Sequence, residues 1–168
     1  MAIKIQGNIV LNHDGSNYSS TNIAVGYGAL VGNTTGTYNT ALGYQSMYYN
    51  TTGVNNTAVG DGSLVSNTYG LYNVALGHNA AYNNTTGQRN SAIGYGALYS
   101  MTTGQQNVAV GYGTLYSAVG SLYNSALGYT ALYSNTTGQY NTGLGYGTLY
   151  NRSEEHTSEL QSRLHLVC

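Results

Sequence analysis

The sequence predicts an all-β fold, a parallel β-solenoid or β-roll of about eight coils, and three observations lead to it. The phrase Asn-x-Ala-aliphatic-Gly recurs eight times between Asn22 and Gly145 at an unbroken spacing of 17 residues, with Gly143 replacing Ala in the last copy. Such a period is typical of solenoids, in which each repeat stacks on its copies. The 24 Gly and the many Thr, Asn and Ser disfavour helix. The apolar residues are mostly small, which suits a narrow core.

Each repeat reads as one coil. We number the coil from its asparagine as positions one to seventeen, and the consensus is Asn-Thr-Ala-Leu-Gly-Tyr-Gly-Ala-Leu-Tyr-Ser-Asn-Thr-Thr-Gly-Gln-Tyr. Positions one to six and eight to eleven predict two short strands, and the glycines at positions five and seven bend the chain between them. Asn-Thr-Thr-Gly at positions twelve to fifteen predicts the closing turn. Stacking at the strand spacing gives a rod roughly 35–40 Å long.

Two aliphatic columns form the predicted core. Position four holds Val25, Leu42, Val59, Leu76, Ile93, Val110, Leu127 and Leu144. Position nine holds Leu30, Met47, Leu64, Ala81, Leu98, Leu115, Leu132 and Leu149. Two such side chains contribute about 1.5–3 kcal/mol each, whereas ordering each of 17 residues costs about 1–2 kcal/mol. Ladder hydrogen bonds, buried tyrosines and other chains must supply the balance.

The alanine at position three is expected on the strand face opposite this core. Together with the glycine at position five, it forms a smooth strip that allows another subunit to approach closely. Steric tightness within a single coil is the other interpretation of the same strip, and the sequence leaves both open.

The asparagine at position one is predicted to form a structural amide ladder along the rod, because stacked side-chain amides can hydrogen-bond to their copies. Its members are Asn22, Asn39, Asn56, Asn73, Asn90, Asn107, Asn124 and Asn141.

The 19 tyrosines provide the candidate recognition residues. One ladder, at position six, is Tyr27, Tyr44, Tyr95, Tyr112, Tyr129 and Tyr146. Another, at position ten, is Tyr48, Tyr82, Tyr99, Tyr116, Tyr133 and Tyr150. Tyrosine combines a large contact area with a polar tip. An exposed ladder is expected to stack on the sugar rings of a glycan, and a buried one is expected to hold a trimer seam together; the sequence does not say which ladder is exposed.

The composition argues against catalysis, metal binding and nucleic-acid binding. Charged residues make up 5% of the chain and the net charge is −1, so no basic patch is available to neutralise phosphates. Asp61 and His78 replace the position-six tyrosine in successive coils, so we expect them to be neighbours. One histidine and one carboxylate are too few for a zinc site, and most glycosidases need paired carboxylates. We therefore expect no catalytic residues, no metal, no cofactor and no enzymatic activity.

The two ends differ from the repeats. Residues 1–21 are expected to form an N-terminal strand, cap or attachment segment; they contain no secretory signal, and no apolar run in the chain is long enough for membrane insertion. After Tyr150 the composition changes abruptly. Arg152-Ser-Glu-Glu-His-Thr-Ser-Glu-Leu-Gln-Ser162 is similar to the in-frame translation of a common short-read sequencing adapter. We therefore interpret 152–168 as a translated adapter artefact, with a polar C-terminal cap as the alternative.

The repeats resemble the head repeats of trimeric autotransporter adhesins, which contain Asn-Ser-Val-Ala-Ile-Gly-x-Gly-Ala at a period of about 14 residues. The matching stretches include Asn90-Ser-Ala-Ile-Gly-Tyr-Gly-Ala97 and Asn22-Ile-Ala-Val-Gly-Tyr-Gly-Ala29. The Tyr-rich version with Asn-Thr-Thr-Gly turns looks closer still to repeat regions of phage tail-fibre proteins. The resemblance implies a left-handed β-roll that assembles as a homotrimer and carries adhesion at a surface. The period of 17 departs from that of the adhesins, so the extra residues are expected to enlarge a turn.

The expected function is therefore that of a non-enzymatic tail-fibre segment of a virion that attaches to a host receptor or glycan. The alternative is the head fragment of a bacterial surface adhesin, located at the cell surface. A lower alternative is an ice-binding solenoid, suggested by a file of threonines in the turn: Thr34, Thr51, Thr85, Thr102 and Thr136.

Overall fold

The computed structural model describes residues 3–5, 9–11 and 22–151, and the interpretation of 152–168 falls outside them. The described residues form ten three-residue strands and contain no helix. The strands are β1 (Ile3–Ile5), β2 (Ile9–Leu11), β3 (Ile23–Val25), β4 (Thr40–Leu42), β5 (Thr57–Val59), β6 (Val74–Leu76), β7 (Ser91–Ile93), β8 (Val108–Val110), β9 (Ser125–Leu127) and β10 (Thr142–Leu144).

The strands lie in a single sheet in sequence order. From β3 to β10 every pair is parallel, and each residue pairs with its equivalent 17 positions later, as Ala75 does with Ala92. β1 and β2 are antiparallel, and β2 pairs with β3 through Leu11 and Val25. The predicted all-β parallel solenoid is confirmed, with about seven turns.

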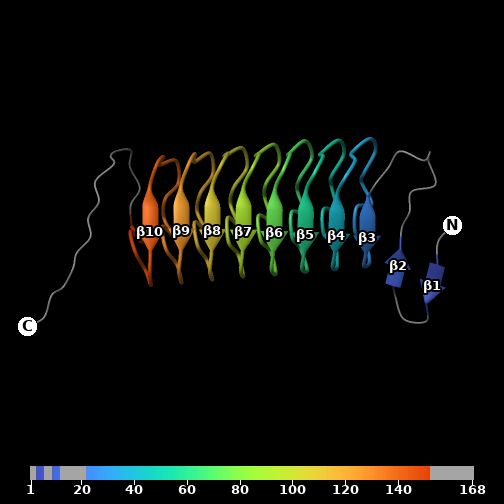
Figure 1. Ribbon diagram of the computed structural model, residues 1–168, viewed down its shortest axis with the longest axis horizontal. Helices are drawn as coiled ribbons and strands as arrows, with labels where there is room; N and C mark the ends of the chain where they lie inside the picture. The colour runs from blue at the N-terminus through green and yellow to red at the C-terminus, as the bar shows by residue number, and fades with distance from the viewer. Residues whose placement is uncertain (1–2, 6–8, 12–21, 152–168) are drawn as a thin grey trace, which may run out of the picture.

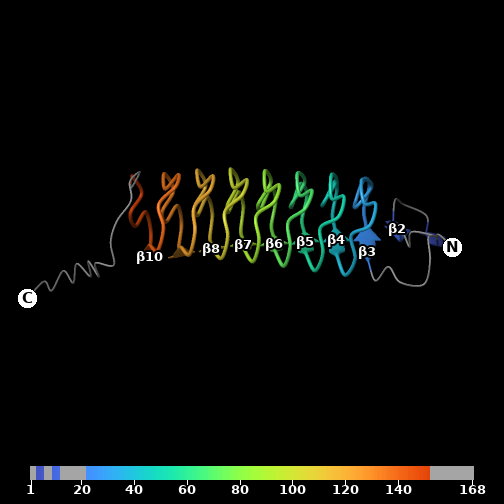
Figure 2. The ribbon, with the colours of Figure 1, turned by 90° about the horizontal axis from the view of Figure 1, so that it is seen from above.

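The coils stack as a rod. In Figure 1 the eight parallel strands follow one another from blue β3 to orange β10 along the long axis. Figure 2 shows that the strands occupy one side of the rod and that the connecting loops cross on the other. Within the described ranges, no helix offers an apolar stretch of membrane-spanning length.

Each coil has one regular strand rather than the predicted two. Positions two to four form it, whereas positions eight to eleven form a turn in which the position-nine residue has a positive φ, such as 54° at Leu98. Left-handed φ is costly for leucine and persists only where the surroundings enforce it. Here the Leu98 amide donates to the Thr114 carbonyl of the next coil at 3.0 Å, and this bond recurs between other coils.

The orientation of the strand corrects the predicted core. Position three points inward, and the alanines of β4 to β8 are fully buried. Position four points outward: Val25, Val59, Leu76 and Val110 are half-buried, and Leu42, Ile93, Leu127 and Leu144 are exposed. The prediction of Val25, Leu42, Val59, Leu76, Ile93, Val110, Leu127 and Leu144 as core was therefore wrong, as was the outward alanine strip.

The narrow interior is the physical reason for this orientation. The position-nine column is buried as predicted, from Leu30 to Leu132, with Leu149 partly buried. A methyl group built on Gly143, the position-three residue of β10, would meet the Leu132 side chain at 3.2 Å. Only a side chain the size of alanine therefore fits between the strand and the leucine column, and the larger aliphatics must face outward.

Asparagine columns fill the rest of the interior. The predicted position-one ladder is confirmed: Asn39 to Asn141 are buried, and each backbone N–H donates to the side-chain oxygen of the preceding member at 2.8–3.0 Å. A second column at position twelve runs from Asn33 through Asn50 and Asn67 to Asn84 by side-chain amide bonds of 2.7–2.8 Å. It stops at Met101, which has no amide to donate, so the buried Asn84 Oδ1 has no partner.

Candidate recognition surface

The position-six tyrosines form an exposed column. Tyr95, Tyr112, Tyr129 and Tyr146 are 46–81% exposed, and successive ring centroids lie 4.9–5.1 Å apart with planes within 8° of parallel. Tyr27 and Tyr44 form a similar pair at 5.7 Å. The glycine at position five reverses the chain after the strand and brings each ring onto the outside of its coil.

The position-ten tyrosines form a second column that is less exposed. Rings from Tyr82 to Tyr150 stack at 4.9–5.3 Å, and all but Tyr150 of these are half-buried. Each ring lies over the coil before it: a methyl built on Gly96 would meet the Tyr116 ring at 3.2 Å. The position-seven glycine thus makes room for this ring. Tyr48 also belongs to this position, and its ring packs edge-on against Tyr49.

The stacking determines what these tyrosines can offer a ligand. A ring inside a ladder has another ring over each face, at the offset distances that aromatic pairs prefer. The expected stacking of sugar rings on tyrosine faces is thus available only at the ends of a ladder. Along its length, the position-six column presents ring edges and phenol groups repeated about every 5 Å.

A third aromatic column, at position seventeen, was missed by the sequence reasoning. Tyr38, Tyr72, Tyr123 and Tyr140 are 43–65% exposed, and Tyr123 stacks on Tyr140 at 4.9 Å. Arg89 occupies the same position in the fourth coil, and its guanidinium carbon lies 5.7 Å from the centre of the Tyr72 ring. The tyrosine at position seventeen of the consensus repeat could have predicted this column.

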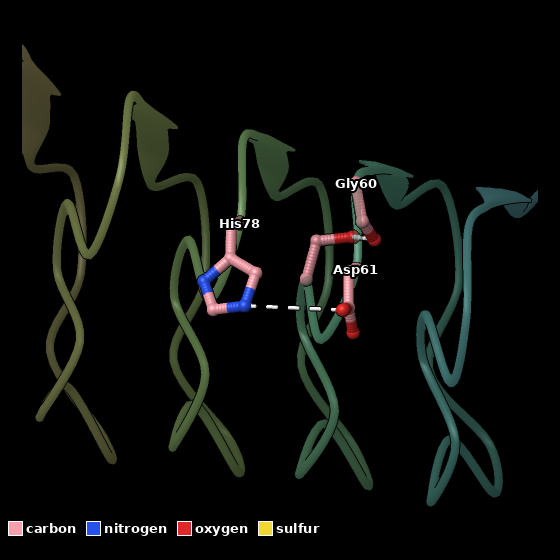
Figure 3. A network of polar contacts seen from close by, with 4 residues as sticks. Gly60, Asp61 and His78 are labelled. Atoms are coloured by element: carbon pink, nitrogen blue, oxygen red, sulfur yellow. Dashed lines mark hydrogen bonds and ion pairs between the residues drawn. The ribbon is translucent and has the colours of Figure 1, made fainter.

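Asp61 and His78 interrupt the position-six column. Their side chains lie side by side on consecutive coils, as expected, with His78 Nε2 3.8 Å from Asp61 Oδ2 (Figure 3). Both side chains are about half exposed, at 58% for Asp61 and 46% for His78. His78 stacks on Tyr95 at 5.2 Å and thereby continues the aromatic column that Asp61 breaks. No group of three or more His, Cys, Asp or Glu side chains suited to a metal ion occurs among residues 3–5, 9–11 and 22–151.

An apolar strip runs beside these columns on the outer face of the sheet. Position four contributes the outward aliphatics, and position two adds Ile23 and Val108, which are 55% and 44% exposed. The charged side chains Asp61 and Arg89 lie at positions six and seventeen, so neither belongs to the strip. Exposed apolar side chains gathered in this way are typical of interaction surfaces.

The threonine file carries internal hydrogen bonds. The hydroxyls of Thr34, Thr51, Thr85 and Thr102 each donate to a backbone carbonyl of the next coil at 2.9–3.2 Å. These hydroxyl protons stabilise the turn stack and are not free to bind ice, which weakens the ice-binding alternative.

Alkaline pH is expected to destabilise the rod. Burial, followed by the neighbouring rings of Tyr99 and Tyr133, raises the pKa of Tyr116 above its ordinary value. The folded state therefore resists deprotonation, and this contribution is present below pH 10 and is lost as the pH rises through the folded-state pKa. We expect the urea midpoint to fall as the pH rises above about 10, and Tyr116→Phe to reduce the fall. An unchanged fall in Tyr116→Phe would contradict this origin.

A scan against protein-family models matched none of them, and searches of the curated proteins and of the solved structures gave no significant match. The functional proposal therefore depends on the surface itself and on the repeat sequence.

Proposed function

We propose that the protein is a non-enzymatic adhesive rod, a tail-fibre-like segment of a virion that attaches to a receptor or glycan on a host cell, and that three copies assemble side by side. The bacterial surface adhesin remains the alternative setting for the same kind of rod. The observation that carries the proposal is the apolar position-four strip, which runs along the sheet through all eight repeats.

The strip supports assembly because it is costly to leave in water. Leu127 and Leu144 are 50% and 70% exposed in the single chain. Burying such side chains fully is worth about 1.5–3 kcal/mol each. Because the strip repeats once per coil, identical rods placed around a common axis would bury many copies of it at once. We also propose that the coils wind in a left-handed sense, as the resemblance to adhesin heads implies.

The tyrosine columns support the adhesive part. If the sheet face packs at a common axis, the exposed phenol groups of positions six and seventeen remain available for polar contacts with a ligand. A row of hydroxyls about 5 Å apart suits a ligand that is itself extended and rich in hydrogen-bonding groups, such as a glycan chain.

Light scattering tests the assembly. The particle in solution is expected to have three times the 17.7 kDa mass of one chain. Ile93→Asp is expected to yield single chains, because it places a charge in the apolar strip. Val119→Asp is the matched control. Val119 is exposed to a similar extent, 43% against 37% for Ile93, but it lies in a turn and not on the sheet. A folded single chain for the unaltered protein, or equal effects of the two variants, would refute the assembly.

Cell and glycan binding test the adhesive role. Replacing Tyr95, Tyr112 and Tyr129 by serine is expected to abolish binding while the mass stays unchanged. The matched control replaces Tyr99, Tyr116 and Tyr133, which are half-buried, and is expected to lower thermal stability more than the first set does. Binding that survives in the first variant would remove position six as the recognition surface.

A further inference from the structure

The break in the position-six column has the geometry of a binding site. We define it as Tyr44, Asp61 and His78, from three consecutive coils. Tyr27 covers one face of Tyr44, and Tyr95 covers one face of His78. Asp61 is the column member between Tyr44 and His78, its side chain is shorter than a ring, and His78 directs Nε2 toward it (Figure 3).

The spacing suits one planar group. Neighbouring rings in this column are 4.9–5.7 Å apart, so two coil steps separate Tyr44 and His78 by about 10 Å. Atoms in optimal contact lie about 3.5–4.0 Å apart. A flat group midway would therefore lie about 5 Å from each ring centre, the step that a further aromatic ring would take if Asp61 were tyrosine.

The carboxylate determines the charge of the group. Asp61 is the only acidic residue of the repeats, is 58% exposed, and has its Oδ2 3.8 Å from His78 Nε2. A cation held between two aromatic faces gains from both rings. A guanidinium also donates paired hydrogen bonds in the plane of a carboxylate, which a lysine ammonium does not match. The site thus combines a planar slot with the counter-charge for a planar cation.

The chain itself contains a precedent for this arrangement. In the position-seventeen column, the Arg89 guanidinium takes the place of a ring and stacks on Tyr72, with 5.7 Å between its central carbon and the ring centre. That separation equals the Tyr27–Tyr44 step. A guanidinium therefore fits an aromatic column of this rod at the natural coil spacing.

We propose that the break at Tyr44, Asp61 and His78 binds a guanidinium group, supplied by an exposed arginine side chain of a protein partner. The proposal uses residues of one chain only, so it does not depend on the assembly or on glycan attachment. The three contacts are solvent-exposed, and we expect binding of a single arginine in the millimolar range.

Histidine NMR on the full chain tests the site directly. The sequence has four histidines, so a chain labelled with ¹³C at the histidine ring gives few signals, and His78→Tyr identifies the one from His78. A capped Gly-Gly-Arg-Gly-Gly peptide is expected to shift the His78 signal saturably. The same peptide with citrulline, which is planar but uncharged, or with lysine, which is charged but not planar, is expected to bind at least fivefold more weakly.

Two substitutions of Asp61 distinguish the effect of its charge from the effect of the space beside it. Asp61→Asn removes the charge and keeps the slot, and Asp61→Tyr fills the slot with the consensus ring; both are expected to weaken arginine binding at least fivefold. Arg89→Gln, which also changes the net charge but lies outside the break, is the control and is expected to bind like the unaltered chain. Circular dichroism checks that each variant is folded. Equal binding of the arginine and citrulline peptides, or unchanged binding in either Asp61 variant, would overturn the proposal.

Discussion

Replacing Gly77 by alanine is expected to destabilise the rod by about 3 kcal/mol or more, although it adds only one methyl group. Gly77 is the position-five residue of the fourth coil and has a φ of +133°. A Cβ built there would lie 2.6 Å from the Gly94 carbonyl oxygen of the next coil. Backbone cannot move aside as a flexible side chain can, so the substitution must separate the two coils.

Urea unfolding followed by far-ultraviolet circular dichroism measures this effect, and Gly120→Ala is the matched control. Gly120 lies in a turn outside the left-handed region, and its Cβ would meet only the Thr103 hydroxyl at 3.5 Å. Alanine there is expected to leave stability unchanged or to raise it by up to about 1 kcal/mol, because it reduces the freedom of the unfolded chain. Similar losses for the two variants would contradict the close-approach explanation.

Replacing Asn73 by serine is expected to cost about 1–3 kcal/mol or more, because the buried Asn90 N–H loses its acceptor and the Gly87 carbonyl keeps only the 3.4 Å bond from Asn84 Nδ2. The Asn73 side chain is buried, donates to the Gly87 carbonyl at 2.8 Å and accepts the Asn90 N–H at 3.0 Å. Serine is too short to make both bonds. The loss is expected to appear as a lower urea midpoint and as faster exchange of the Asn90 amide hydrogen.

The control for this change is the same substitution at Asn83. Asn83 is half-buried at position eleven, where the third and fifth coils already have Ser66 and Ser100. Asn83→Ser is expected to change stability by less than about 0.5 kcal/mol. If Asn73→Ser were equally mild, the position-one ladder would not be a main support of the stack.

The stacking of the coils was predictable from the repeat alone. A strict 17-residue period places a copy of each residue above and below it, so the asparagine ladder, the leucine column and the Asp61–His78 neighbours follow without knowledge of the coil's cross-section. The same argument predicts the tyrosine columns but not their exposure. Exposure depends on where each position lies around the coil, and the period contains no such information.

The division between core and surface was the part that failed. A three-residue strand with alanine at position three and aliphatics at position four can turn either residue inward, and hydrophobicity favours the larger one. The structure buries Ala92 and exposes Ile93. Only the packed cross-section shows why: the buried Leu98, Met101 and Asn90 already occupy the interior that Ile93 would need.

The sequence by itself determined that this chain stacks on itself in register, because its spacing never varies across eight copies. The tertiary structure decided which strand face is outside, that the ring faces inside the tyrosine ladders are covered, and that Asp61 interrupts the position-six column beside His78. These features depend on distances across the coil and between coils. These distances are set by the close packing of side chains inside the coil, and the repeat period alone does not say which side chains pack inside.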